Sequence, residues 1–134
     1  MIKTALKVRV PVAMPRCAAA HIMVVDDDPH FRSLARNLLE AAGMTVIEAA
    51  GVREGLHQMQ AQPIDLVILD VVLRGEDGIK ALGFLKTSFP ETKILIATRL
   101  YLQFATPPGA DAVLSKSEVE RLCPLVEQLL ERSK

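Results

Sequence analysis

Short apolar runs alternate with segments of helical periodicity from residue 21 to the end of the chain. The runs are too continuous for strands with one solvated face, so they predict strands that are buried on both sides of a sheet. The five predicted strands are HIMVV (21–25), MTVIEA (44–49), IDLVILD (64–70), KILIAT (93–98) and ADAVLS (110–115).

Between these strands, apolar residues recur at spacings of three and four, which is typical of a helix with one buried face. The first helix is predicted to be capped by Asp28, to begin at Pro29 and to end at Gly43. Its predicted buried face consists of Phe31, Leu34, Ala35, Leu38 and Leu39. The other predicted helices run from Val52 to before Pro63, over 78–89 and over 117–134.

Two signals in the closing segment predict where its helix begins. Ser117 and Glu120 have the spacing of a capping box, which places the helix start at Ser117. Pro124 either kinks this helix or marks the start of its regular part.

Strict alternation of strand and helix predicts an α/β fold with a doubly wound, five-stranded parallel sheet and helices on both faces. Ligands of such open sheets bind outside the carboxyl ends of the strands. We therefore expect function at that edge.

The first twenty residues differ from the rest, because they carry four basic residues and no acidic one. Their apolar stretch is interrupted by charge, which excludes a secretory signal peptide. We interpret residues 1–20 as a basic N-terminal extension, either a tail or an added edge strand; an organelle-targeting peptide and a true start at Met14 are the alternatives. Residues 21–134 have the size of one domain.

The composition excludes several classes of protein. Sixteen basic and sixteen acidic residues give a formal net charge of zero, so no charge footprint for nucleic acid is present. No apolar stretch approaches the roughly 18 residues of a membrane span, and we expect a cytoplasmic protein. Cys17 and Cys123 are too few for a disulfide framework or a metal knuckle.

Polar side chains that follow the predicted strands should converge at one edge of the sheet. They are Asp26 and Asp27 after the first strand, Asp70 after the third, Thr98 after the fourth and Lys116 after the fifth. Two carboxylates about 4 Å apart repel by about 4 kcal/mol at an effective dielectric near 20. A divalent cation removes this repulsion, and oxygen ligands alone favour Mg²⁺, with Mn²⁺ as the alternative ion.

A carboxylate beside a metal ion can also act as a nucleophile toward phosphorus. Asp70 is the candidate, because the Lys116 ammonium and the Thr98 hydroxyl would offset and bind the incoming phosphoryl oxygens.

From His21 onward the chain resembles the receiver domain of bacterial two-component response regulators. The matching pieces are VVDDD, DLVILDVVLRGEDG, ILIAT and GADAVLSK, in order and at suitable spacing. The resemblance implies a flavodoxin-like fold and phosphorylation of Asp70 by a histidine kinase or phosphotransfer protein. It also implies that Asp26, Asp27 and the Val72 carbonyl bind Mg²⁺, that Thr98 and Lys116 sense the phosphate, and that Asp77 and Gly78 form the turn into the third helix.

The chain departs from the family pattern in several places. Arg74 and Ser117 replace prolines, and Val113 replaces the expected aromatic switch residue. Only ten residues separate Thr98 from Gly109, so the fourth helix is predicted to be short, irregular or absent. We therefore expect intact chemistry with an atypical output face.

Val72 and Leu100 lie two positions beyond Asp70 and Thr98 and flank the expected path of the hydrolytic water. Because both are apolar, the sequence predicts a long-lived phosphoryl group.

Three function classes stay open: a phosphorylation-controlled signalling receiver, a phosphate-independent interaction module, and a receiver fragment of a larger DNA-binding regulator or hybrid kinase. We expect catalysis of its own phosphorylation and dephosphorylation only, since Val72 stands where an aspartyl phosphatase needs a second Asp. Homodimerisation is left open.

Overall fold

The structure is a computed structural model that describes residues 19–73, 76–99 and 106–131. Its elements, in chain order, are β1 (His21–Val25), α1 (Pro29–Ala41), β2 (Thr45–Ala49), α2 (Val52–Ala61), β3 (Leu66–Leu69), β4 (Val72–Leu73), β5 (Glu76–Asp77), α3 (Gly78–Ser88), β6 (Lys93–Thr98), β7 (Ala112–Ser115), the 3₁₀ helix η2 (Lys116–Arg121) and α4 (Leu122–Glu131).

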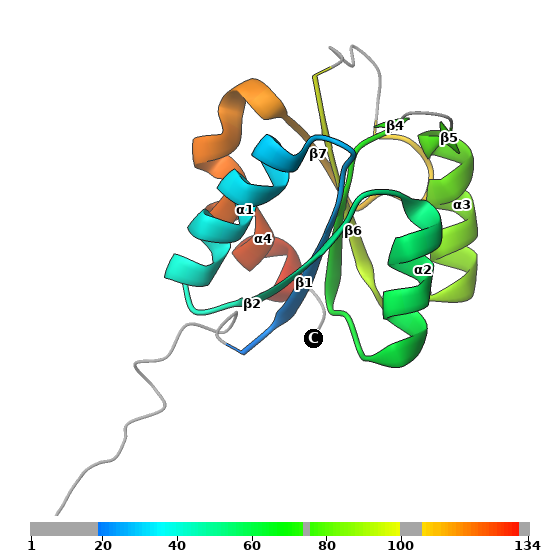
Figure 1. Cartoon of the computed structure of the whole chain (residues 1–134), viewed down its shortest axis with the longest axis horizontal. Coiled ribbons are helices and arrows are strands. Elements are labelled where there is room, and N and C mark those ends of the chain that lie inside the picture. Colours follow the sequence, from blue (N-terminus) through cyan, green and yellow to red (C-terminus); the bar gives the residue numbers. More distant parts are fainter. Residues whose placement is uncertain (1–18, 74–75, 100–105, 132–134) are drawn as a thin grey trace, which may run out of the picture.

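The main sheet has five parallel strands in the order β2-β1-β3-β6-β7, with helices on both faces (Figure 1). β1 therefore lies between β2 and β3, and the strand order reverses its direction at β1. This arrangement confirms the predicted doubly wound, flavodoxin-like α/β fold. β4 and β5 form a separate antiparallel pair after β3, which the sequence pattern did not predict.

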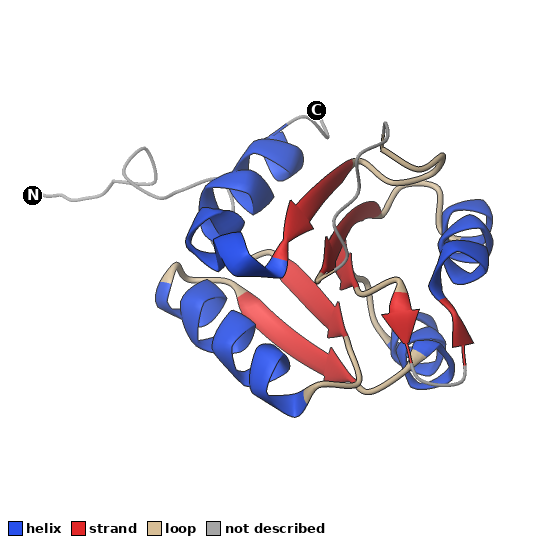
Figure 2. Ribbon diagram, turned by 90° about the horizontal axis from the view of Figure 1, so that it is seen from above, coloured by secondary structure: helices blue, strands red, loops and turns tan. Residues whose placement is uncertain are grey.

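Alternate residues of the strands supply two separate cores, one on each face of the sheet. Ile22 and Val24 of β1 pack with α1 and α4, whereas Met23 and Val25 pack with α2 and α3. The two helix layers lie on opposite sides of the strands in Figure 2. A strand that contributes to both cores has no polar face, which explains the continuous apolar runs in the sequence.

Most of the predicted helix ends are confirmed. The Asp28 side chain accepts a hydrogen bond from the His30 N–H with Pro29 at the first position of α1, and Gly43 takes a φ of +94° after its end. Asp77 caps α3 by accepting from the N–H groups of Ile79 and Lys80.

The predicted start of the closing helix at Ser117 is wrong. The cap is Ser115, whose side chain accepts from the Ser117 N–H, and the first turns form η2 instead of an α-helix. The backbone at Glu118 leaves the helical region, and the regular helix α4 begins only at Leu122. Pro124 therefore marks the start of the regular part, where its missing N–H removes no internal hydrogen bond.

Several predictions concern parts of the chain beyond the described residues. Residues 1–18 of the basic extension, Arg74, and residues 100–105 with Leu100 are among them. In the connection between β6 and β7, the described residues 106–111 form turns and bends and no helix. No helix within the described ranges is long and apolar enough to span a membrane.

Gly78 is required where α3 begins, because the backbone after Asp70 passes against it. A Cβ at this position would lie 2.3 Å from Val71 Cα and 2.4 Å from the Val71 oxygen, so the backbone itself would have to move. We expect Gly78→Ala to lower the free energy of unfolding by about 2 kcal/mol, as overpacking does.

The matched control is Gly83→Ala in the same helix, where a Cβ would meet nothing within 4 Å. This change should raise stability by about 0.5–1 kcal/mol, because alanine has the higher helix propensity. Urea unfolding of both variants measures the difference. Equal effects of the two substitutions would contradict a specific backbone contact at Gly78.

Candidate functional site

Two loops and the start of a helix meet at the carboxyl edge of the sheet. Asp26 and Asp27 directly follow β1, and Asp70 directly follows the neighbouring strand β3. Lys116 is the first residue of η2 after β7. The sheet therefore brings together side chains from three segments that are 43 to 90 positions apart in the sequence.

The three aspartates form one cluster. A carboxylate oxygen from each of Asp26, Asp27 and Asp70 lies within 4.8 Å of the others. Asp26 is 1% exposed and Asp70 is 5% exposed, whereas Asp27 is half-buried. Two buried carboxylates beside a third strongly favour a positive partner, because burial weakens their solvation by water.

Lys116 supplies part of that positive charge. Its Nζ lies 2.6 Å from Asp26 Oδ2 and 2.8 Å from Asp70 Oδ2, and its side chain is only 6% exposed. The ammonium also lies over the Phe31 ring, 4.6 Å from the centroid, in a cation–π contact. This internal ammonium therefore relieves part of the carboxylate repulsion in addition to any divalent ion.

The remaining carboxylate oxygens contact backbone groups. The Asp28 N–H donates to Asp26 Oδ1 and the Val72 N–H donates to Asp70 Oδ1, both at 2.9 Å. Asp26 Oδ2 is buried and has the Lys116 ion pair, but it accepts no hydrogen bond of good geometry from the described residues. Each carboxylate oxygen has two lone pairs, so this cluster retains acceptor capacity for a hard cation.

Two opposing effects set the pKa values in this region: burial disfavours the charged form of each group, and contacts between opposite charges favour it. Burial raises the pKa of Asp26, and contacts with Lys116 and the Asp28 N–H only partly oppose it. Burial also acts against the charged form of Lys116, but its close contacts with the Asp26 and Asp70 carboxylates outweigh burial and raise its pKa. Lys116 is therefore held as an ammonium between the two carboxylates.

The oxygen-rich cluster fits a divalent cation of the Mg²⁺ type, which takes one or more carboxylates and completes its shell with water. Val72, the predicted carbonyl ligand, lies two residues beyond Asp70, and the role of its carbonyl stays a prediction. Thr98 is fully buried at the end of β6, where it pairs in register with Ser115 of β7. It lies at the expected edge, and its role toward phosphate also stays a prediction.

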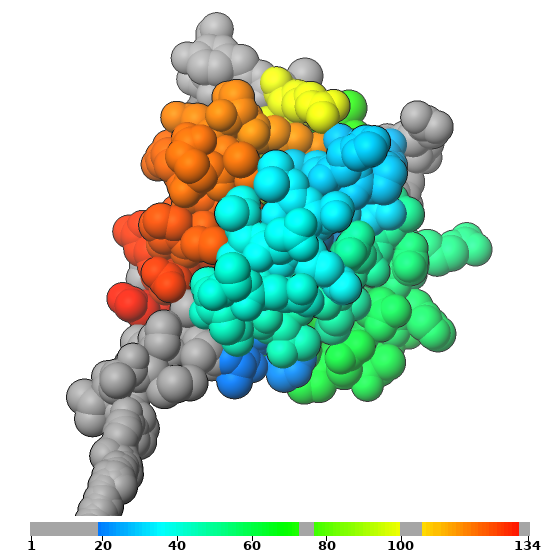
Figure 3. Space-filling view, turned by 60° about the vertical axis from the view of Figure 1, so that its left-hand side comes forward, coloured from blue at the N-terminus to red at the C-terminus, as the bar shows by residue number. Residues whose placement is uncertain are grey.

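A groove of about 410 Å³ opens beside the cluster, between α1 and the start of η2. Figure 3 shows α1 (cyan) next to η2 and α4 (orange to red) on this face.

Arg99 and Asp28 line the groove and form an ion pair, with 2.9 Å between Arg99 Nη2 and Asp28 Oδ2. Burial opposes the charge of Asp28, but backbone N–H groups and Arg99 lower its pKa. Leu34, predicted to be buried, lines this groove and is exposed.

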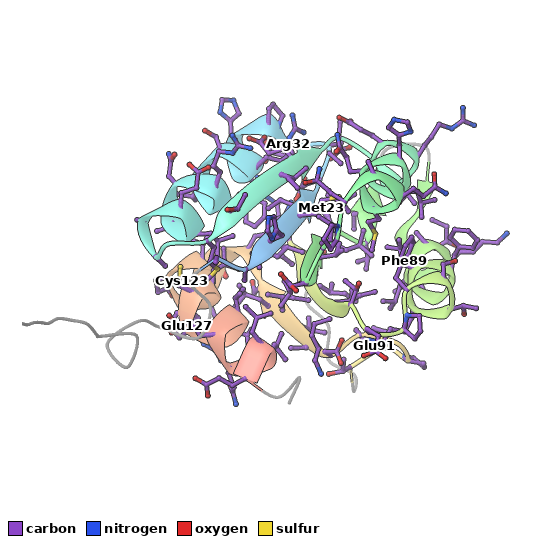
Figure 4. The ribbon with its side chains drawn as sticks, turned by 90° about the horizontal axis from the view of Figure 1, so that it is seen from below. Met23, Arg32, Phe89, Glu91, Cys123 and Glu127 are labelled. Carbon is purple, nitrogen blue, oxygen red and sulfur yellow. The ribbon has the colours of Figure 1, made fainter. Side chains whose placement is uncertain are left out.

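Arg32 and Glu48 also support the site, although the sequence analysis missed them. The Arg32 guanidinium donates to the backbone carbonyl of Asp26 and to the Glu48 carboxylate. Figure 4 shows Arg32 on α1, on the side of the helix next to β2. The signal was present in the sequence, because Glu48 is the only charged residue in the otherwise apolar run 44–49.

Comparison with known proteins agrees with this geometry. The family model of the response regulator receiver domain matches residues 22–127. The transcriptional regulatory protein CpxR of Escherichia coli is 33% identical over 116 residues, which cover 84% of this chain and 50% of that protein. The CAI-1 autoinducer sensor kinase/phosphatase CqsS of Vibrio cholerae is 36% identical over 72 residues, which cover 54% of this chain and 10% of that protein.

Among solved structures, the response regulator TrrA of Thermotoga maritima, crystallised with Mg²⁺ and a beryllium fluoride, has a TM-score of 0.74. It is 29% identical, and the match covers 82% of this chain and 98% of that structure. The chain spans half or less of the length of the curated relatives named here.

Proposed function

This chain belongs to the response regulator receiver domain family, and we propose that it accepts a phosphoryl group on Asp70 from a histidine kinase or a phosphotransfer protein. The observation that carries the proposal is the cluster of Asp26, Asp27 and Asp70 with the Lys116 ammonium between two of them. Phosphoryl transfer to a carboxylate needs a nucleophile, a metal site and a cation next to the reacting oxygen, and the chemistry and spacing of these residues suit all three roles.

Asp26, Asp27 and Asp70 would hold Mg²⁺, with the Val72 carbonyl as the further protein ligand implied by the family resemblance. When bound, the ion would neutralise part of the negative charge on the incoming phosphoryl oxygens. The crystallised TrrA complex with Mg²⁺ and a beryllium fluoride supports this assignment for the family.

In the proposed reaction, an Asp70 carboxylate oxygen forms a bond to phosphorus. The bond between phosphorus and the donor atom breaks, and its electron pair leaves with the donor, a histidine nitrogen in the case of a kinase. Lys116 Nζ lies 2.8 Å from Asp70 Oδ2, so phosphoryl oxygens attached at Asp70 arrive within reach of the ammonium. The Thr98 hydroxyl would bind a phosphoryl oxygen at the same edge.

A titration with beryllofluoride tests this function. Beryllofluoride with Mg²⁺ should shift the amide resonances of residues around Asp70 in ¹⁵N-labelled protein beyond the shifts that Mg²⁺ alone causes, and beryllofluoride without Mg²⁺ should leave the spectrum unchanged. A spectrum unaffected by both components together would contradict the proposed function and favour the phosphate-independent interaction module.

The same spectra test the prediction of an atypical output face. Val113, in place of an aromatic switch residue, packs from β7 against the core under α2 and α3. We expect the amide shifts to stay near the cluster, because no large ring is present at this position to couple the site to the surface. Shifts that extend along α4 would show ordinary coupling and would contradict the prediction.

We also propose that the apolar side chain of Val72 slows hydrolysis of the phosphoryl group. Val72 is half exposed beside Asp70 and cannot hydrogen-bond an attacking water. Val72→Asn should therefore speed decay about tenfold, which corresponds to about 1.4 kcal/mol in the barrier.

The decay is measured by loss of phosphoprotein after removal of the phosphodonor. Phe84→Asn is the control, since Phe84 is similarly exposed but lies in the middle of α3. Unchanged decay in Val72→Asn, or an equal acceleration in both variants, would contradict the role of Val72.

A further inference from the structure

Arg32 joins the carboxyl ends of β1 and β2 through a single guanidinium. Its Nη1 donates to the Asp26 carbonyl at 2.6 Å, and its Nε donates to Glu48 Oε1 at 3.0 Å. The Arg32 side chain is mostly buried, so both contacts are largely protected from water. Hydrogen bonds from a charged, rigid donor are strong and directional.

The carbonyl that Arg32 binds belongs to the peptide unit between Asp26 and Asp27. This unit is planar, so a fixed carbonyl also fixes the nitrogen of Asp27 and both flanking Cα atoms. On the other side, the Asp26 N–H donates to the Ala49 carbonyl at 3.0 Å. Both peptide units around Asp26 are therefore anchored to neighbouring elements.

We propose that Arg32, oriented by Glu48, is a positioning residue for the cation site, because it fixes the peptide unit from which Asp26 and Asp27 extend. The inference rests on the proposed function, since it concerns binding of the same ion. Arg32 itself contacts no reacting group. Residues that orient metal ligands typically affect metal affinity by about 10- to 100-fold when removed.

Because Arg32 is positively charged, a positioning role and a purely electrostatic role predict opposite changes in Mg²⁺ affinity when it is removed. A cationic side chain near a cation site repels the ion, so its removal by charge alone would tighten binding. Loss of positioning would weaken binding instead. The sign of the change in Mg²⁺ affinity therefore distinguishes the two effects.

Arg36 provides a matched control one helical turn further along α1. It too forms an ion pair with Glu48, at 3.1 Å, and it donates to a backbone carbonyl of β2, that of Val46, at 2.8 Å. That carbonyl lies three residues before the end of β2 and outside the acidic cluster. Arg32 and Arg36 thus share chemistry and a partner, but only Arg32 contacts the ligand-bearing loop.

The experiment measures MgCl₂ binding to the whole chain by isothermal titration calorimetry, in wild type, Arg32→Ala, Arg32→Lys and Arg36→Ala. We expect Arg32→Ala to weaken Mg²⁺ binding about tenfold and Arg36→Ala to change it by less than about twofold. Arg32→Lys should lie between wild type and Arg32→Ala, because an ammonium replaces one contact but not the two-pronged geometry. If Arg32→Ala does not fold, the Mg²⁺ affinity of Arg32→Lys is compared with those of wild type and Arg36→Ala instead.

A second measurement follows phosphorylation by acetyl phosphate as Mg²⁺ is varied. Arg32→Ala should raise the Mg²⁺ concentration for half-maximal rate about tenfold and leave the rate at saturating Mg²⁺ within about twofold. Equal weakening in Arg32→Ala and Arg36→Ala, or unchanged or tighter binding in Arg32→Ala, would overturn the inference. Absence of Mg²⁺ binding in the wild type would instead overturn the proposed function.

Discussion

Replacement of Asp70 by asparagine is expected to reduce phosphoryl incorporation from acetyl phosphate and Mg²⁺ to background. The amide keeps the shape of the side chain and can still accept from the Val72 N–H, but it has no anionic oxygen to attack phosphorus. Intact-protein mass spectrometry after incubation with the donor measures the incorporated group.

Asp65→Asn is the matched control, because Asp65 directly precedes β3 and Asp70 directly follows it. Its carboxylate accepts from the His21 N–H at the opposite edge of the sheet, a contact that an amide oxygen can retain. Phosphorylation of this variant should equal that of wild type. Undiminished incorporation in Asp70→Asn would identify another acceptor and refute the assignment.

The second large effect is expected from Lys116→Met, measured as stability in the presence of a chelator. The substitution leaves two buried carboxylates facing each other without the ammonium that lies 2.6 and 2.8 Å from them. Removal of one partner from a buried ionic cluster typically costs about 3–5 kcal/mol. Urea unfolding in excess chelator should therefore show a loss of about 3 kcal/mol or more.

Saturating Mg²⁺ should recover part of this loss, because a cation that binds only the folded chain stabilises it by mass action. Lys86→Met is the control: Lys86 pairs with Asp111 at 3.2 Å, but both side chains are about a quarter exposed. Its loss should be about 1 kcal/mol or less and independent of Mg²⁺. If Lys116→Met lowered the free energy of unfolding no more than Lys86→Met, the buried Asp26 and Asp70 carboxylates would not need the Lys116 ammonium for stability.

Much of the architecture was predictable because its physical causes are local. β1 and β3 are buried on both faces, so their apolar runs have no polar positions and stand out in the sequence. Asp28 with Pro29, and Gly43 with its positive φ, mark the ends of α1 by their own conformational preferences. The alternation of elements predicts parallel strands, and the shared carboxyl edge of parallel strands brings the three aspartates together.

The features that were missed depend on contacts distant in sequence or on segments too short to show a period. β4 and β5 have two residues each, so no alternation can reveal them. Both Ser115 and Ser117 suit a helix cap, and tertiary packing decides between them. Lys116 was expected at the phosphoryl group, but only coordinates show it paired with Asp26 and Asp70.

Lys116 pairs with Asp70 across 46 positions of the chain and with Asp26 across 90. These contacts join residues that are far apart in the sequence, so forming them has a large cost in loop-closure entropy. The ion pairs can offset this cost only once β7 has joined the sheet. A nascent chain that has emerged only as far as β6 carries both carboxylates without their ammonium. The charge balance of the site is therefore completed only when the final strand is in place.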